Sequence, residues 1–174
     1  HGINVIGIDS WAIEPAFIRF IAHDMEKKRS NMPARTRVLF TAHSLPQRII
    51  DGGDPYPQEL HATATAVAKQ LNISEGADWG IAWQSAGRTP EPWIGPDILA
   101  VLHEIADTKS ADGVVVSACG FVADHLEVLY DLDIEAQHLA DELGLAFART
   151  ACVNDDAEVM AALAQRVVLA AQQH

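Results

Sequence analysis

The chain has 174 residues, of which 49% are hydrophobic, so it is long enough for one domain with a sizeable core. Its formal net charge of −12 argues against broad nucleic-acid binding, because that function requires clustered Lys and Arg to neutralise phosphates. No run approaches the roughly 20 apolar residues of a membrane span, and no secretory leader is visible, so we expect a cytoplasmic protein. The two cysteines, Cys119 and Cys152, are expected to be buried hydrophobes rather than a disulfide.

Apolar runs and helical patterns alternate along the chain. We expect strands at residues 3–10, 37–42, 78–85, 112–119 and, as a short run, 145–149. We expect helices at residues 14–29, 57–71, 95–108, 124–144 and 155–172. Near-continuous apolar strands separated by helices predict an α/β fold, with a Rossmann-like, doubly wound parallel sheet of four or five strands. No linker or repeat interrupts the pattern, so residues 1–174 are expected to form a single domain.

A histidine stands where the second of these strands ends, in the stretch TAHSLPQ. Ligands of such sheets bind beyond the carboxyl ends of the strands, so His43 lies at the expected binding edge. An imidazole there can bind a metal ion or accept a proton, since its ordinary pKa is about 6.5. It can equally be a structural residue that caps the following turn, and its position alone does not decide between the two.

An acidic stripe follows the fourth predicted strand. Glu127, Asp131 and Glu135 are spaced by four residues, which places them on one face of a helix. Like charges at this spacing destabilise an isolated helix unless a cation or a base neutralises them. In a chain this acidic the stripe can also be a solvated surface, but it begins at the expected binding edge, which favours a function.

The loop after the third predicted strand combines tryptophans with prolines. Trp83, Arg88 and Trp93 lie in or beside QSAGRTPEPWIGP, a stiff and partly apolar segment. This composition indicates either simple packing of a long loop or a stacking surface for a planar apolar ligand. Phosphate-loop, dinucleotide-binding and nucleophile-elbow motifs are absent from the sequence, so no nucleotide cofactor is expected.

Four stretches together resemble the ferrochelatase family: TAHSLP, GDPYP, WQSAGRTPEPWIGPD and GFVADHLEVLYDLDIEA. They occur in the order and spacing of the C-terminal half of that family, and the resemblance covers nearly the whole chain. The motif forms are most similar to the Gram-positive type, whose substrate is generally coproporphyrin III. The resemblance implies a lyase of haem biosynthesis that inserts Fe²⁺ into a porphyrin, coproporphyrin III or protoporphyrin IX, with release of two protons.

The resemblance also assigns roles to residues. His43 matches the family's active-site histidine, and Glu127 matches the glutamate that faces it across the porphyrin. Asp131 and Glu135 match an acidic line along a partly π-helical segment, so the expected metal contacts are His43, Glu127, Asp131 and Glu135. Six further residues are expected to bind substrate: Ser44, Trp83, Ser85, Trp93, Asp124 and His125. Whether His43 acts as a base or as a metal ligand stays open.

The resemblance further implies an N-terminal half that this chain lacks. We therefore expect the second wall of the cleft to come from that missing half or from a second copy of this chain, and isolated activity to be weak. Some family members hold an iron–sulfur cluster, but the cysteines here predict none on this chain. Two alternatives remain: a domain that binds porphyrin, haem or metal without turnover, and a half-length chelatase for another tetrapyrrole.

Overall fold

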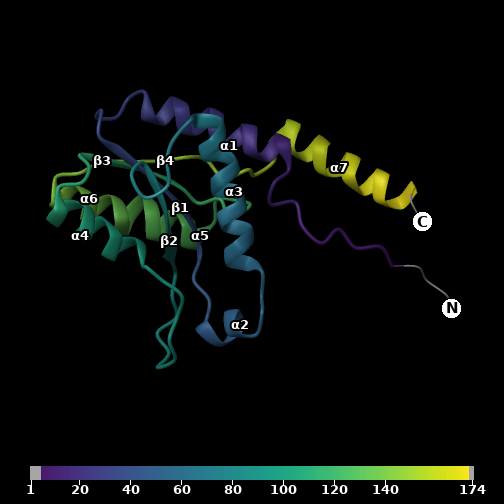
Figure 1. Cartoon of the computed structure of the whole chain (residues 1–174), viewed down its shortest axis with the longest axis horizontal. Coiled ribbons are helices and arrows are strands. Elements are labelled where there is room, and N and C mark those ends of the chain that lie inside the picture. The colour runs from purple at the N-terminus through teal and green to yellow at the C-terminus, as the bar shows by residue number, and fades with distance from the viewer. Residues whose placement is uncertain (1–4, 173–174) are drawn as a thin grey trace.

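The computed structural model describes residues 5–172 and contains one parallel sheet (Figure 1). Its strands lie in the order β2-β1-β3-β4, with every neighbouring pair parallel. The strand bounds are β1 Thr36–His43, β2 Trp79–Gln84, β3 Gly113–Ser117 and β4 Ala146–Arg149. The α/β class and the parallel sheet predicted from sequence are therefore confirmed.

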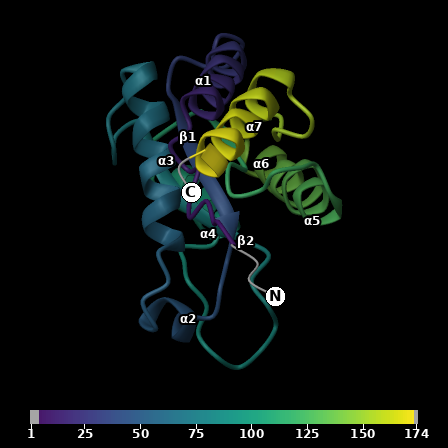
Figure 2. The same cartoon turned by 90° about the vertical axis from the view of Figure 1, so that its right-hand side faces the viewer.

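Helices cover both faces of this sheet (Figure 2). One face packs against α1 (Pro15–Arg29), α3 (Tyr56–Leu71) and the start of α7 (Ala157–Gln172). The other packs against α4 (Ile98–Thr108), η1 (Leu129–Ala136) and α6 (Gln137–Leu143). Among residues 5–172, every helix is too short or too polar to cross a membrane.

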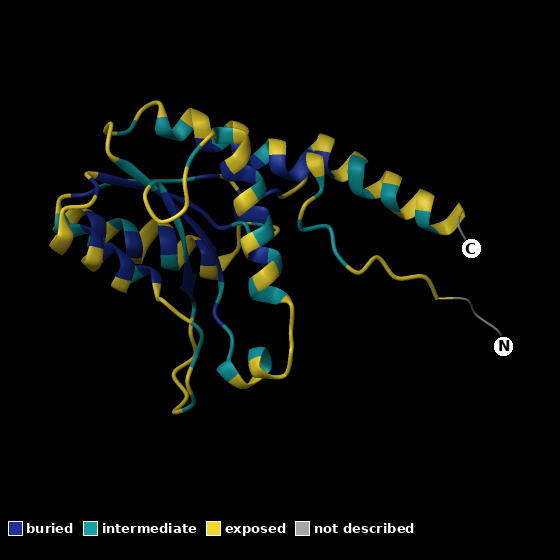
Figure 3. Cartoon of the chain, viewed as in Figure 1, coloured by how far each residue is buried: buried dark blue, intermediate teal, exposed yellow. Residues whose placement is uncertain are grey.

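Strand β1 shows why the sequence forms two cores. Val38 and Phe40 pack into the cluster with α1 and α3, whereas Leu39, between them, packs into the cluster with α4 and η1. All three side chains are at most 1% exposed, because successive residues of a strand point to opposite faces. This central strand, covered on both sides, is therefore buried along most of its length, from Val38 to Ala42, as the burial colours of Figure 3 show for the strands of the sheet.

The single helix expected at residues 124–144 is three joined helices: α5 (Leu126–Val128), the π-helix η1, and α6. Val128, Leu132, Ala136 and Ala140 are all fully buried and are spaced by four. On an α-helix of 3.6 residues per turn, each four-residue step drifts by about 40° around the axis. The wider π turns offset that drift, so the buried stripe keeps facing the sheet. This confirms the partly π-helical segment implied by the resemblance.

The strand predicted at residues 3–10 is wrong where the structure describes it. Val5–Ser10 pairs with no strand among the described residues, and Val5 is 87% exposed; residues 3–4 lie outside the described part. The segment contacts α7 at its inner end, where Arg166 donates to the Ser10 carbonyl at 2.8 Å, and residues 5–9 are exposed. Its apolar residues match the local sequence pattern of a strand. A strand also needs a neighbouring strand to pair with, and the local pattern does not show whether one is available.

The exits of β1 and β3 touch at a glycine. A Cβ built on Gly120 would lie 2.2 Å from the Cβ of Ala42 and 2.8 Å from its Cα. The Gly120 N–H also donates to the Thr41 carbonyl at 3.0 Å, so the backbone cannot move away without losing that bond. Only a residue without a side chain allows this close approach of the two loops.

We therefore expect Gly120→Ala to lower the free energy of unfolding by about 2 kcal/mol, the usual scale for overpacking a tight site. Chemical denaturation followed by circular dichroism measures this difference. Gly7→Ala is the matched control, because a Cβ there meets only Asp9 Oδ1 at 3.8 Å. Equal stability of the two variants would show that the loops are not in the contact described.

Candidate functional site

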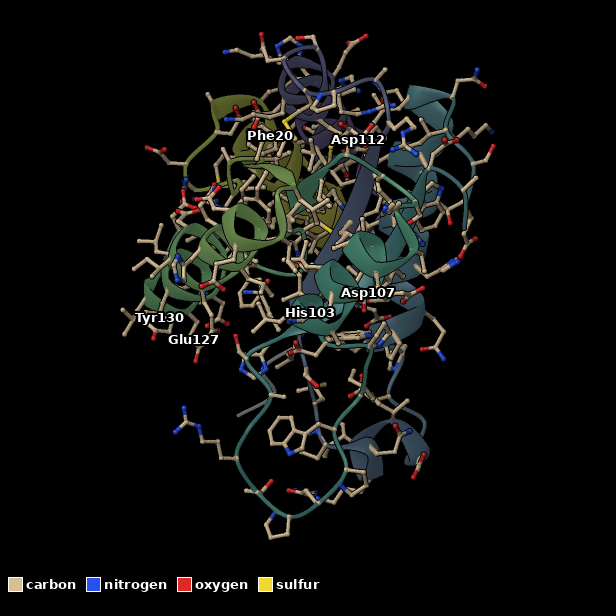
Figure 4. All side chains as sticks on the ribbon, turned by 90° about the vertical axis from the view of Figure 1, so that its left-hand side faces the viewer. Phe20, His103, Asp107, Asp112, Glu127 and Tyr130 are labelled. Atoms are coloured by element: carbon tan, nitrogen blue, oxygen red, sulfur yellow. The ribbon has the colours of Figure 1, made fainter. Side chains whose placement is uncertain are left out.

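His43 and Glu127 meet at the carboxyl edge of the sheet. His43 is the last residue of β1, and Glu127 lies in α5, which follows the exit of the adjacent strand β3. His43 Nε2 lies 3.8 Å from Glu127 Oε2, with the side chains 32% and 53% exposed. In Figure 4, Glu127 and Tyr130 project from the same end of this helical segment. Two groups predicted from separate motifs are thus brought together by strand order.

The hydrogen bond of the His43 ring decides which nitrogen is available. His43 Nδ1 lies within hydrogen-bond distance of the Ser44 carbonyl oxygen. A carbonyl can only accept, so Nδ1 carries the hydrogen, and in a neutral ring Nε2 then keeps a free lone pair. That lone pair faces a carboxylate oxygen, which is also an acceptor. A proton or a cation between the two atoms would relieve this mismatch.

The acidic stripe continues from Glu127 along η1, and Asp131 is its anchored member. Ser85 Oγ donates to Asp131 Oδ2, and Gln84 Nε2 lies 3.5 Å from the same oxygen. The Gln84 side chain is buried and is fixed in turn by Thr41, whose hydroxyl donates to it at 2.9 Å. Ser85 holds a φ of +60°, an unfavourable value for a residue with a side chain, which suggests that its orientation is imposed by this contact. Glu135, one step further, is exposed.

The loops after β1 and β2 are joined to each other. Ser44 Oγ donates to the Ile94 carbonyl at 2.7 Å, and Ile94 N–H donates to the Leu45 carbonyl at 2.9 Å. The half-buried Trp93 lies over Gly87, where any Cβ would meet the indole ring at 2.3 Å. Together these contacts make one stiff wall beside His43, as the proline-rich sequence predicted.

Not every predicted substrate-binding residue presents its side chain to this edge. Ser44 and Trp83 are only 1% and 5% exposed. Trp83 packs against Tyr56, with ring centroids 5.7 Å apart, and burial raises the pKa of that tyrosine. Ser44 and Trp83 therefore pack beneath the site and do not present their side chains to a ligand. His125 is exposed and lies edge-on to Phe121, with ring centroids 5.2 Å apart. Its Nδ1 accepts from the Glu127 N–H at 3.3 Å, which caps the start of α5.

Asp124 is held in a network that the sequence analysis missed. Arg149, the last residue of β4, donates through Nη1 to Asp124 at 2.8 Å, and through Nε and Nη2 to Asp133 at 2.6 and 2.9 Å. Asn154 Nδ2 also donates to Asp124 at 2.8 Å. The Asn154 amide, followed by Arg149, lowers the pKa of the Asp124 carboxyl. A basic residue ending a strand, opposite the helix that carries the acidic stripe, was the signal available in the sequence.

The predicted metal contacts do not form a resident metal site. Within residues 5–172, no group of three or more His, Cys, Asp or Glu side chains is close enough to hold an ion. Of the predicted contacts, His43 and Glu127 form the pair within 4 Å. Burial raises the pKa of both cysteine thiols to about 12, which disfavours the thiolate that metals bind.

Comparison with known proteins places the chain in a family. The ferrochelatase family model matches residues 1–171. A coproporphyrin III ferrochelatase from Anoxybacillus flavithermus is 42% identical over 96% of this chain and 53% of its own length. A ferrochelatase from Herpetosiphon aurantiacus is 45% identical over 88% of this chain and 50% of its own length. The coproporphyrin III ferrochelatase of Bacillus subtilis is 36% identical over 96% of this chain.

The chain belongs to the ferrochelatase family, which confirms the resemblance found in its motifs. It spans about half the length of the curated relatives it matches. A solved CbiX protein of cobalamin biosynthesis from Marinobacter aquaeolei covers 80% of this chain and 98% of its own, at 13% identity and a TM-score of 0.49. That likeness is too low to carry an argument.

The Asp124 network predicts a pH dependence of stability. Because the pKa of Asp124 is lowered in the folded chain, its ionised form stabilises the fold above the ordinary value of 3.8, and this contribution is lost as the pH falls through the folded value. Asp124→Asn should therefore lower the free energy of unfolding at pH 7 by about 1 kcal/mol, after allowance for partial exposure. The difference from wild type should shrink towards pH 2.

Urea unfolding at both pH values measures this difference. Asp107→Asn is the control, because Asp107 lies exposed on α4 and has no hydrogen bond or ion pair among the described residues (Figure 4). A loss for Asp124→Asn that is the same at pH 7 and pH 2 would contradict the ionic role of Asp124.

Proposed function

We propose that this chain supplies the facing His43–Glu127 pair of a ferrochelatase, which inserts Fe²⁺ into a porphyrin and releases two protons. The observation that carries the proposal is the 3.8 Å approach of His43 Nε2 to Glu127 Oε2, in a chain of this family. Coproporphyrin III is the substrate to test first, because it appears in the names of several relatives. Protoporphyrin IX is the alternative porphyrin.

The reaction must remove two pyrrole N–H protons while one divalent ion enters, so charge balances. The neutral His43 ring has its Nε2 lone pair free and can accept a proton or bind the ion, but not both at once. The Glu127 carboxylate can replace water on a hydrated ion or accept a proton. We assign His43 and Glu127 to opposite tasks, and leave open which of them takes the proton.

A ring bound between the two groups requires Glu127 to move. Non-bonded atoms approach to about 3.5–4.0 Å, so a flat ring between two side chains needs a gap of about 7 Å. The present gap is 3.8 Å. Glu127 is 53% exposed and lies next to Leu126, which is 79% exposed, so its rotamer can change without unpacking the core. We propose that porphyrin entry swings Glu127 away from His43.

The remaining acidic residues suit an ion that passes rather than stays. His43 and Glu127 leave most of the coordination positions of Fe²⁺ to water or to the porphyrin. Asp131, fixed by Ser85, is the next carboxylate along η1, and the exposed Glu135 follows. We propose that the three carboxylates attract the hydrated ion and transfer it inward, in the order Glu135, Asp131, Glu127.

An apolar surface lies beside the acidic line. Val122, Leu126, Tyr130 and Ile134 are between 51% and 79% exposed, which is unusual for a group of large apolar side chains on one segment. A porphyrin face, or a further part of the protein, would gain by covering them. Because the chain spans half the length of its relatives, we propose that the remaining half, or a second copy, forms the opposite wall.

His43→Ala is the direct test of this proposal. We expect it to reduce metal insertion at least 100-fold, the usual minimum for losing a general base, while porphyrin binding stays within about twofold of wild type. Insertion is followed by absorbance with Fe²⁺ and coproporphyrin III under anaerobic conditions. The chain is assayed as it is, and again with the remaining half of the Anoxybacillus flavithermus relative added as a separate polypeptide.

His103→Ala is the matched control, because His103 is exposed on α4 and is drawn in Figure 4 on a different element from Glu127. Wild-type rates for His43→Ala would refute the assignment of His43. A binding domain without turnover is the alternative, favoured by the half-length match. It predicts a shift of the Soret band with no metalloporphyrin formed in either assay.

A further inference from the structure

Arg149 is the most heavily bonded charged side chain near the site. It is the last residue of the edge strand β4, paired in register with Val116, and its side chain is only 14% exposed. Three of its nitrogens are used: Nε and Nη2 bind Asp133 as a fork, and Nη1 binds both Asp124 and, at 3.0 Å, the Thr150 carbonyl. Donation of hydrogen bonds to Asp133 is the largest effect that raises the pKa of Arg149 above its ordinary value.

The two carboxylates that Arg149 binds lie on either side of Glu127 in the chain. Asp124 precedes Glu127 in the loop after β3, and Asp133 follows it on η1. Asp124 is tied a second time by Asn154, which donates from Nδ2 at 2.8 Å and accepts the Asp124 N–H at 2.9 Å. The segment that carries Glu127 is therefore fixed at both ends to one rigid strand.

Packing alone fixes this segment in only one direction. Val128 and Leu132 are fully buried and set how deep the helical segment lies against the core. Apolar contacts are not directional, so they resist rotation about the helix axis and sliding along the sheet edge only weakly. A bidentate guanidinium–carboxylate pair is directional and restricts both motions. Since the Glu127 side chain is itself exposed and packs against little, the position of its backbone at the sheet edge depends on this restriction.

The segment that carries Asp133 is also unusual in its helix type. The segment η1 is a π-helix, a rare geometry that is frequently found at functional sites. Asp133 lies in the middle of η1, between Asp131 and Glu135, and its carboxylate binds Arg149, whereas that of Asp131 binds Ser85 on the side of β2. One residue of the π-helix thus anchors it so that its neighbours can face the site.

We infer that Arg149 is a positioning residue, which holds the Asp124–Asp133 segment so that the backbone bearing Glu127 stays at the sheet edge opposite His43 while the Glu127 side chain remains free to rotate. The inference rests on the proposed function for its consequence in catalysis. Its structural content, the restriction of this one segment, can be measured independently of any activity. Arg149 does not touch substrate and acts through Glu127.

The test compares Arg149→Gln with Arg35→Gln. Arg35 makes a similar forked ion pair, with Asp112, but this pair joins the residues just before β1 and β3, at the opposite edge of the sheet. Hydrogen exchange measured by mass spectrometry should be at least tenfold faster in residues 124–136 of Arg149→Gln and unchanged there in Arg35→Gln. Arg149→Lys keeps the charge but not the fork, so its exchange should fall between wild type and Arg149→Gln.

The second readout is insertion of Fe²⁺ into coproporphyrin III, with the complementing half present. Arg149→Gln should reduce kcat about tenfold or more, as loss of a group that orients a site residue does, while KM for the porphyrin stays within twofold. Arg149→Lys should recover part of kcat, and Arg35→Gln should match wild type. If Arg149→Gln does not fold, Asp133→Asn removes one partner of the fork and should give the same pattern more weakly.

Unchanged exchange in residues 124–136 of Arg149→Gln, or of Asp133→Asn where Arg149→Gln does not fold, overturns the inference. Equal kcat for Arg149→Gln and Arg35→Gln overturns its catalytic part. If wild type inserts no metal under any condition, the proposed function fails, and the exchange result still decides whether Arg149 holds the segment. The two failures are therefore distinguishable.

Discussion

Gly120 brings the exit of β3 against the exit of β1, and the candidate site depends on that contact. A Cβ at Gly120 would overlap Ala42, so a residue with any side chain would push the loop that carries Glu127 away from His43. Sheet order makes the contact possible, because β1 and β3 are neighbours and end at the same edge. Two motifs about 80 positions apart in the sequence then place an imidazole and a carboxylate 3.8 Å apart.

His43 and Glu127 are held in place by different interactions. His43 is fixed by the sheet and by the Ser44 carbonyl, so its ring has little freedom. Glu127 is exposed and can rotate, but the segment that bears it is anchored to β4 through Arg149. The proposed function requires Glu127 to move aside for a flat substrate and then return, and an anchored backbone with an exposed carboxylate suits that movement. The acidity of the chain adds an attractive field for cations at the same edge.

Much of the fold was predictable because it depends on local periodicity. Alternation of apolar strands with helices predicted the four observed strands and the helices on both faces, and the His43 and Glu127 loops were predicted to share one edge. The strand at residues 3–10 failed, because an apolar run does not specify a partner edge. The sequence predicted one helix at residues 124–144, and only the family resemblance implied that part of it is π-helical, since a four-residue spacing fits either helix type. The division into three helices became visible in the structure.

The supporting residues were the least predictable part. Arg149 ends a short strand and Asn154 follows five residues later. A basic residue at a strand end is a weak signal in the sequence, but nothing local identifies Asp124 and Asp133 as the partners of Arg149, or Asp124 as the partner of Asn154. Trp83 and Ser44 were predicted to bind substrate, but tertiary packing buries both side chains. Their positions in the motifs do not reveal this burial. Residues that act through hydrogen bonds to distant segments become visible only when the strand order is known.

The most direct test of the account is a double-mutant cycle on Fe²⁺ insertion with His43→Ala, Glu127→Gln and the double variant, using the chain and its complementing half. If the two residues form one unit, the account predicts that the double variant is about as slow as the slower single variant, because residues that act as a unit are strongly non-additive. Losses that multiply, so that the double variant is slower by the product of the two single effects, would contradict a shared site.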